Sequence, residues 1–260
     1  RLDPATLGRR MARLEKAMQV ALFVKSPQGY ALTQAGAQLL ERAGTVEQAM
    51  RGAAVGDVAQ SETLSGQIRL GAPDGCANFL LPQVCAAIGR DNPALDIQIV
   101  ALPRVFNLTR READMAIGVS APTAGRLVVR QVTEYRLHLA ASDDYLARHA
   151  PILALGDLVA HRMVGYIPDM IFDRELDYLA DLGGGRVALA SNSVTVQVNM
   201  LRQGAGLGVV HDFSLPFAPE LRVVLADAVA LTRAFYLIRH ADDARNARLA
   251  RFADLLSEGL

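Results

Sequence analysis

Strand-like and helix-like segments alternate from residue 65 to the end of the chain, and this alternation constrains the fold more than any other feature. The strand-like segments are 66–73, 95–102, 114–120, 125–142, 161–167, 186–191 and 234–240. The helix-like segments are 76–93, 107–113, 143–151, 193–206 and 243–260. Strands that alternate with helices predict an α/β fold with a sheet of mainly parallel strands.

Composition is typical of a globular protein, with 51% hydrophobic and 21% charged residues. No apolar stretch approaches the roughly 20 residues of a membrane-spanning helix, and the opening "RLDPATLGRR" is polar and basic, unlike a signal peptide. Cys76 and Cys85 match neither a disulfide framework nor a metal-ligand spacing. We therefore expect a cytoplasmic protein without a membrane segment, a metal or a cofactor.

Positive charge gathers at the start of the chain. Residues 1–36 hold six Lys and Arg against two Asp and Glu, although the net charge of the whole chain is zero. The spacing of Leu7, Met11, Leu14 and Met18 predicts a helix that starts at Pro4, with its arginines off the apolar face. Two short strands around "KSPQG" follow. This is either an ordinary solvated helix and turn, or a DNA-binding helix with a wing.

A second helix is expected from Thr33, which is a good helix cap. Its seam of small and apolar residues has the spacing of a helix that pairs with its own copy, and consists of Leu39, Ala43, Val46, Met50 and Ala53. The alternative is a helix that packs on the body of the protein. Residues 56–66 are polar and contain Gly and Ser, as linkers do.

Two segments place small or polar residues where a strand ends and a helix begins, which is where open α/β sheets bind ligands. One contains Asp74, Gly75 and Cys76, and the other contains Asn192, Ser193 and Thr195. Free N–H groups there suit an acceptor-rich ligand, but Asp74 would repel an anion, so the charge of the ligand stays open. The alternative is a pair of plain helix caps. No catalytic or metal-binding constellation is present, so we do not expect an enzyme.

The segment "DPATLGRRMARLEKAMQVALFVKSPQGYALTQAGAQLL" resembles the winged helix-turn-helix of LysR-type transcriptional regulators. "READMAIG" and "LRQGAGLGVV" are similar to patterns in the effector domain of that family. The resemblance implies a partial winged helix-turn-helix (1–36), a dimerising linker helix and hinge (37–64) and an effector-binding domain (65–260). That domain would have two lobes like type 2 periplasmic binding proteins, with lobe I at 65–137 and 231–260 and lobe II at 138–230.

The resemblance also implies contacts and partners. DNA contacts would come from the residues Ala5, Thr6, Arg9, Arg10, Lys25, Ser26, Gly29 and Tyr30. The first four would face the major groove, Lys25 and Ser26 would reach phosphates, and Tyr30 would pack or hydrogen-bond at the base of the wing. Partners would be double-stranded promoter DNA, a small-molecule effector and further copies of the chain in a homodimer or homotetramer. RNA polymerase is a further candidate.

This sequence departs from the family pattern at several positions. It begins inside the helix-turn-helix, and Gly8 and Lys25 replace the usual serine and arginine. Cys76 stands where Ser or Thr commonly contacts the effector, and His211 lies in a segment that is usually aliphatic. The expected effector set also includes Arg104, for which a solvated surface position is the alternative, and Gly118. The rival function is a solute-binding protein of the same two-lobed fold that does not act on DNA.

Overall fold

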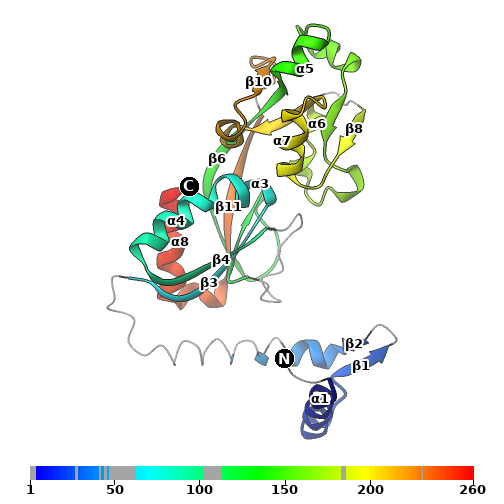
Figure 1. Cartoon of the computed structure of the whole chain (residues 1–260). Coiled ribbons are helices and arrows are strands. Elements are labelled where there is room, and N and C mark those ends of the chain that lie inside the picture. The colour runs from blue at the N-terminus through cyan, green and yellow to red at the C-terminus, as the bar shows by residue number, and fades with distance from the viewer. Residues whose placement is uncertain are drawn as a thin grey trace. The chain divides into compact units, whose positions relative to one another are not determined.

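A computed structural model describes residues 4–26, 29–40, 42–43, 46, 63–101, 113–182, 186–229 and 231–260. The chain divides into two compact units, Arg1–Gln60 and Ser61–Leu260. Figure 1 shows the elements of each unit.

The first unit contains α1 (Pro4–Met18) followed by an antiparallel hairpin of β1 (Phe23–Ser26) and β2 (Gly29–Leu32). Glu15 ties the helix to the hairpin, because its Oε1 accepts hydrogen bonds from the backbone N–H groups of Leu22 (2.8 Å) and Phe23 (3.0 Å). The helix and hairpin predicted from the sequence are therefore present.

Thr33 caps the next helical segment, as expected, because its hydroxyl oxygen accepts a hydrogen bond from the N–H of Gly36 at 3.0 Å. Residues 34–40, 42–43 and 46 are helical. Val46 of the predicted seam is 59% exposed, whereas Met50 and Ala53 lie outside the described residues. Self-pairing through this seam therefore stays a prediction.

The second unit is an α/β structure built on one mixed sheet. Its strands are β3 (Ser65–Ala72), β4 (Ala94–Ala101), β5 (Met115–Gly118), β6 (Leu127–Ser142), β7 (Met163–Gly165), β8 (Val187–Ala190), β9 (Leu207–His211), β10 (Leu221–Val224) and β11 (Leu231–His240). Its α-helices are α3 (Asp74–Phe79), α4 (Leu81–Asp91), α5 (Asp143–Arg148), α6 (Tyr178–Asp181), α7 (Val194–Arg202) and α8 (Ala247–Gly259). Its 3-10 helices are η3 (Leu155–Ala160), η4 (Pro168–Met170), η5 (Arg174–Leu176), η6 (Asp212–Phe217) and η7 (Ala241–Arg245).

The strand order β4-β3-β5-β11-β6-β9-β7-β8 divides this sheet into two ends joined by long strands. β3 is parallel to β4 and β5 at one end, and β7 is parallel to β8 and β9 at the other. We call the first end, with α3, α4 and α8, lobe I, and the second end, with β10 and α5 to α7, lobe II. The expectation of mainly parallel strands therefore applies within each end, but not to the strands that connect them.

β6 and β11 run between the two lobes (Figure 1) and pair antiparallel with each other, from Leu127 with His240 to Leu137 with Leu231. The 16-residue β6 then continues along β9 in lobe II. The return from lobe II to lobe I is made by β11, which begins at Leu231, the position where lobe I was expected to resume.

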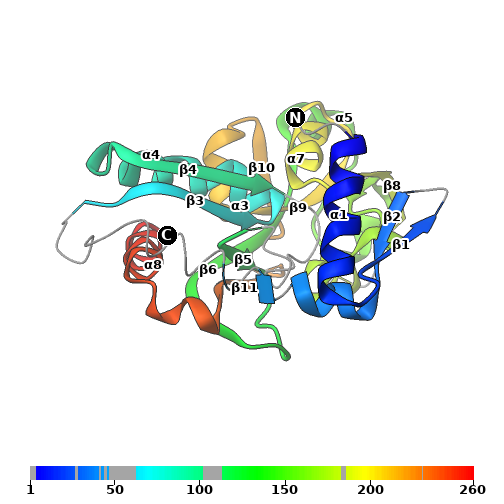
Figure 2. The same ribbon diagram turned by 90° about the horizontal axis from the view of Figure 1, so that it is seen from below.

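Lobe I differs from the sequence prediction in one helix. The segment 76–93 was expected to be one continuous helix, but it is part of two, α3 and α4, with Leu80 between them. Pro82 lies in the first turn of α4 and has no N–H to donate to the preceding turn, which explains the break. Figure 2 shows α3 and α4 along the strands β3 and β4. The short helix predicted at 107–113 lies outside the described residues, apart from Ala113.

In lobe II, the start of α7 has the helix cap that the sequence left open as the alternative to a ligand contact. Ser193 caps α7, because its hydroxyl oxygen accepts a hydrogen bond from the N–H of Val196 at 3.2 Å. The helix ends at Arg202, and Gly204 just beyond its C-cap has a φ of +72° and donates its N–H to the carbonyl of Leu201. This left-handed conformation favours glycine, so Gly204 terminates the helix.

Candidate functional site

The expected DNA-contacting helix presents its arginines to solvent. Arg9 and Arg10 of α1 are exposed, Thr6 is half-buried, and Arg9 donates a hydrogen bond from Nη2 to the hydroxyl of Thr6 at 3.4 Å. The side chain of Ala5 is outside the described part of the structure. Two exposed guanidinium groups on neighbouring positions can contact phosphates or base edges.

The hairpin that follows brings the predicted wing residues together across its strands. Lys25 is opposite Tyr30, and Ser26 is opposite Gly29, which has a φ of +123°. The side chains of Lys25 and Ser26 lie outside the described residues. Tyr30 is 58% exposed, so its ring is available to a partner.

In the second unit, the two strand-end segments chosen from the sequence meet across the two lobes. Asp74, in the first turn of α3, accepts three hydrogen bonds on Oδ2 from the start of α7. The donors are the hydroxyl of Ser193 (2.9 Å) and the N–H (2.9 Å) and hydroxyl (3.1 Å) of Thr195. The carboxylate thus occupies the position where a ligand anion was considered, and it satisfies the N-terminus of α7 itself.

A second hydrogen bond joins the lobes through a carboxylate. The hydroxyl of Ser120, just after β5, donates to Oδ2 of Asp173, the residue that caps η5 in lobe II. Beside it, the Nε of Arg233 in β11 forms an ion pair with Oε2 of Glu175 at 2.7 Å. Both lobes are therefore held together by charge-assisted contacts at separate points.

Gly75 brings α3 unusually close to α7. A Cβ at this position would lie 3.3 Å from Cγ1 of Val194, which is tighter than ordinary van der Waals contact. The absence of a side chain on Gly75 thus lets the two helix starts approach each other.

Cys76 is fully buried behind this contact. Burial, with a smaller contribution from Cys85, raises the pKa of the Cys76 thiol well above its ordinary value, and burial raises the pKa of Cys85 to about 11. Neither cysteine is therefore a reactive thiolate at neutral pH. The two lie on separate helices, α3 and α4, and not on one helix as the sequence indicated.

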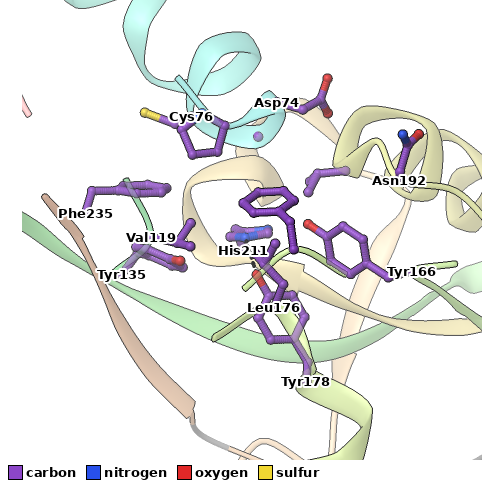
Figure 3. A pocket seen from close by; sticks show the side chains of 14 residues that line it. Asp74, Cys76, Val119, Tyr135, Tyr166, Leu176, Tyr178, Asn192, His211 and Phe235 are labelled. Carbon is purple, nitrogen blue, oxygen red and sulfur yellow. Dashed lines mark hydrogen bonds between the residues drawn. The ribbon is translucent and has the colours of Figure 1, made fainter. Parts of the chain in front are cut away.

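A small cavity lies between the lobes at this place; we call it the interlobe cavity. Its volume is about 20 Å³, which is room for about one water molecule. Of the predicted set, Gly75 lines it together with Asp74, Cys76 and Asn192. Figure 3 shows the last three side chains. Ser193 and Thr195 do not, since their hydroxyls are bound to Asp74.

Two other predicted effector residues are not placed there. Gly118 does not line the interlobe cavity; a Cβ on it would lie 2.7 Å from Cδ1 of Ile238, so this glycine serves the packing of β5 against β11. Arg104 lies outside the described residues.

Aromatic side chains that were not selected from the sequence also line this cavity. Tyr135 comes from β6, Tyr166 and Tyr178 come from lobe II, and Phe235 comes from β11 (Figure 3). The rings of Tyr135 and Phe235 stack with centroids 4.4 Å apart. Of the described residues that line this cavity, none is Lys or Arg.

His211, at the end of β9, lies in the middle of these aromatic rings (Figure 3). The hydroxyl of Tyr178 is hydrogen-bonded to its Nε2 at 3.3 Å. Burial lowers the pKa of His211 to about 3, and the nearby Asp74 opposes this only partly, so the imidazole is neutral at neutral pH. The sequence showed that a histidine stands at position 211 in a segment that is usually aliphatic, but it did not show which residues surround this side chain.

Neither a metal site nor a membrane span appears among the residues that the structure describes. The described residues contain no group of three His, Cys, Asp or Glu suited to a metal ion. Among the same residues, every helix is too short or too polar to cross a bilayer.

The geometry of the second unit defines a class of protein: a two-lobed α/β binding domain with a cavity at the junction of its lobes. Residues 61–260 match the family model described as the LysR substrate binding domain. This chain therefore belongs to the LysR family.

Named relatives and solved structures agree with this assignment. The HTH-type transcriptional regulator CrgA of Neisseria meningitidis serogroup C (strain 8013) is 24% identical over 264 residues, which cover 98% of this chain and 88% of that protein. The structure of CrgA has a TM-score of 0.68 at 24% identity, and the match covers 99% of this chain and 90% of that one. The full-length Vibrio cholerae virulence activator AphB has a TM-score of 0.64 at 20% identity, covering 100% of this chain and 91% of that one.

These relatives are named transcriptional regulators rather than enzymes. The rival interpretation, a solute-binding protein that does not act on DNA, is therefore not favoured.

Proposed function

We propose that this chain is a transcriptional regulator that binds double-stranded promoter DNA through α1 and the β1–β2 hairpin and responds to a small-molecule effector bound between its lobes. The observation that carries the proposal is the combination, in one LysR-family chain, of a helix–hairpin unit bearing exposed arginines with a two-lobed unit that has a cavity at its lobe junction. Such a protein works where the chromosome is, so we propose a cytoplasmic location.

The proposed DNA-contacting residues are Ala5, Thr6, Arg9, Arg10, Lys25, Ser26, Gly29 and Tyr30. The exposed Arg9 and Arg10 support this set, as does the exposed ring of Tyr30 on the hairpin. We place the boundaries of the DNA-binding part at 1–36 and of the linker helix at 37–64, with the effector domain at 65–260. Its lobe I would comprise 65–137 and 231–260, and lobe II 138–230.

Fluorescence anisotropy of the full-length protein with its own upstream DNA tests this function. Arg10→Ala should weaken binding roughly 5- to 150-fold if the side chain contacts a base edge, from about 1–3 kcal/mol per contact. A substitution that removes one phosphate contact should instead reduce the slope of log K against log salt by about 0.9. Arg251→Ala, at an exposed arginine of α8, is the matched control. If Arg10→Ala binds this DNA as tightly as the wild type does, the assignment of this face of α1 to DNA contact is wrong.

We propose that the functional protein is a homodimer or homotetramer joined through the linker helix, because two DNA-binding units on one symmetric dimer would recognise two half-sites. The exposed Val46 on this helix supports the proposal. RNA polymerase is proposed as a further partner at the promoter. Light scattering of the full-length protein should give at least the mass of a dimer, and a monomer at micromolar concentration contradicts the assembly.

For the effector, we propose contacts from Asp74, Gly75, Cys76 and Asn192, which line the interlobe cavity, with Ser193 and Thr195 holding Asp74 from behind. The position of the cavity at the carboxyl ends of the strands β3 and β8 supports this site. A ligand larger than one water molecule requires the lobes to separate or the lining side chains to move, and this movement is a means to signal effector binding.

A further inference from the structure

A second and much larger cavity lies in lobe II, next to the interlobe cavity; we call it the lobe II chamber. Its volume is about 290 Å³, which is close to the lower end of the range for small-molecule pockets. Its aliphatic lining comprises Val164, Ile171, Leu176, Leu179, Val187 and Val209. A concave, largely aliphatic lining of this size suits an apolar ligand.

The two cavities share a wall. Tyr166, Leu176 and Tyr178 line both of them, and Tyr178 carries the hydroxyl that is bonded to His211. A molecule in the lobe II chamber is therefore next to the polar atoms of the interlobe cavity. The interlobe cavity itself, at about 20 Å³, has room for one polar group the size of a water molecule.

Charge on the chamber lining argues against an anionic ligand. Of the described residues that line the chamber, none is Lys, Arg or His, and the one charged side chain is the exposed Asp177. The amide of Gln197 also lines it and donates from Nε2 to the carbonyl of Ser191 at 2.8 Å. A carboxylate moved into this lining would lose its hydration without gaining a cation, which is costly.

Two buried polar atoms in the interlobe cavity need a partner. Within the described residues, the hydroxyl of Tyr135 and Nδ1 of His211 make no hydrogen bond of acceptable geometry, although the hydroxyl of Tyr178 is a neighbour of Tyr135. Tyr135 is 3% exposed and His211 4% exposed, so solvent does not satisfy these atoms. Buried polar groups are normally hydrogen-bonded, so the two atoms point to a bound molecule with a matching group.

We propose that an uncharged small molecule, about the size of one substituted ring, places its apolar body in the lobe II chamber. Its single hydroxyl or carbonyl group reaches past Tyr166 and Tyr178 into the interlobe cavity and bonds to Tyr135 or His211. The inference rests on the proposed function only in treating this ligand as the effector. The chamber and its ligand class are derived from the geometry and are tested by direct binding.

Three probes of one shape test the ligand class on the full-length protein: 4-ethylphenol, which is uncharged with a hydroxyl, 4-ethylbenzoate, which is anionic, and ethylbenzene, which has no polar group. Titration calorimetry should show 4-ethylphenol binding at least about 10-fold more tightly than 4-ethylbenzoate, because the chamber offers no cation to the carboxylate. Ethylbenzene should bind more weakly than 4-ethylphenol. Equal or tighter binding of 4-ethylbenzoate, or no binding of any probe at millimolar concentration, overturns the proposal.

Two matched substitutions locate the site. Val187→Phe fills the chamber from β8 and should weaken 4-ethylphenol binding at least about 10-fold, whereas Val159→Phe, at a position that is 91% exposed, should leave it unchanged. The melting temperature of each unliganded variant shows whether it is folded. If Val187→Phe misfolds, the smaller change Val187→Leu replaces it. Wild-type affinity in the folded chamber variant overturns the assignment. Loss of the proposed regulatory function would appear separately, as failure of the wild-type protein to bind its upstream DNA.

Discussion

His211 should make the protein lose stability between neutral and mildly acidic pH. Its pKa is about 3 in the folded protein, where burial disfavours the charged imidazolium, compared with an ordinary value of 6.5. Between these two values the unfolded chain binds more protons than the folded one, so stability falls as the pH falls. The stabilisation is fully present above pH 6.5 and is progressively lost toward pH 3.

The linkage relation gives a loss of about 2 kcal/mol for this one residue on going from pH 7 to pH 5. For a folded unit of this size, such a change lowers the melting temperature by about 4–8 °C. The assay is thermal or urea unfolding of the wild type and of His211→Leu at several pH values. The variant removes the titrating group but leaves the hydroxyl of Tyr178 without its partner, so the comparison uses the slope with pH rather than absolute stability.

The wild type should lose about 2 kcal/mol more than the variant over this interval. Other groups titrate in both proteins, and their contribution cancels in the difference. Equal pH slopes for the two proteins refute the reasoning, since they mean that His211 is not held neutral by burial.

Two further substitutions test the contact between the lobes, and an alkylation experiment tests the buried cysteines. Asp74→Asn removes the charge that accepts three hydrogen bonds from α7 and should cost about 1–3 kcal/mol in urea unfolding; unchanged stability contradicts the role of this contact. Gly75→Ala places a Cβ against α7 and should destabilise the protein, whereas Gly89→Ala, which meets nothing within 4 Å, should be neutral or stabilising by up to about 1 kcal/mol. Cys76 and Cys85 should resist iodoacetamide at neutral pH until the protein unfolds, because burial raises both pKa values; rapid alkylation of the folded protein, detected by mass spectrometry, would contradict this expectation.

Much of the fold could be predicted from the sequence because its local signals are strong. The alternation of strands and helices and the helix cap at Thr33 both depend on neighbouring residues, and the structure has them where expected. The break at Leu80 was missed although Pro82 was visible, because a proline in a first helical turn is compatible with both one interrupted helix and two helices. The antiparallel pairing of β6 with β11 joins residues about a hundred positions apart, and no local pattern contains that information.

Only the strand-end residues of the candidate site could be predicted from the sequence. Asp74, Gly75, Cys76 and Asn192 follow from the rule that ligands bind where strands end, and they do line the interlobe cavity. Tyr135, Tyr178 and Phe235 come from the long connecting strands and from lobe II, and each one alone has the pattern of an ordinary core aromatic. Which face of a 16-residue strand turns toward the cavity depends on its register with β11, which the sequence does not state.

The sequence also left a conflict between an anion-binding helix start and the negative charge of Asp74, and the contacts of Asp74 bear on it. The N-terminus of α7 already has its anion, since Asp74 accepts hydrogen bonds from the N–H of Thr195 and from two hydroxyls. A ligand carboxylate would have to displace this carboxylate and would then place two negative charges side by side, which is unfavourable. An uncharged ligand meets no such cost, because it can bond to the neutral His211 and to Tyr135 while Asp74 keeps the lobes joined. The residue that made the charge of the ligand ambiguous in the sequence thus becomes, once its partners are known, a reason to favour an uncharged effector.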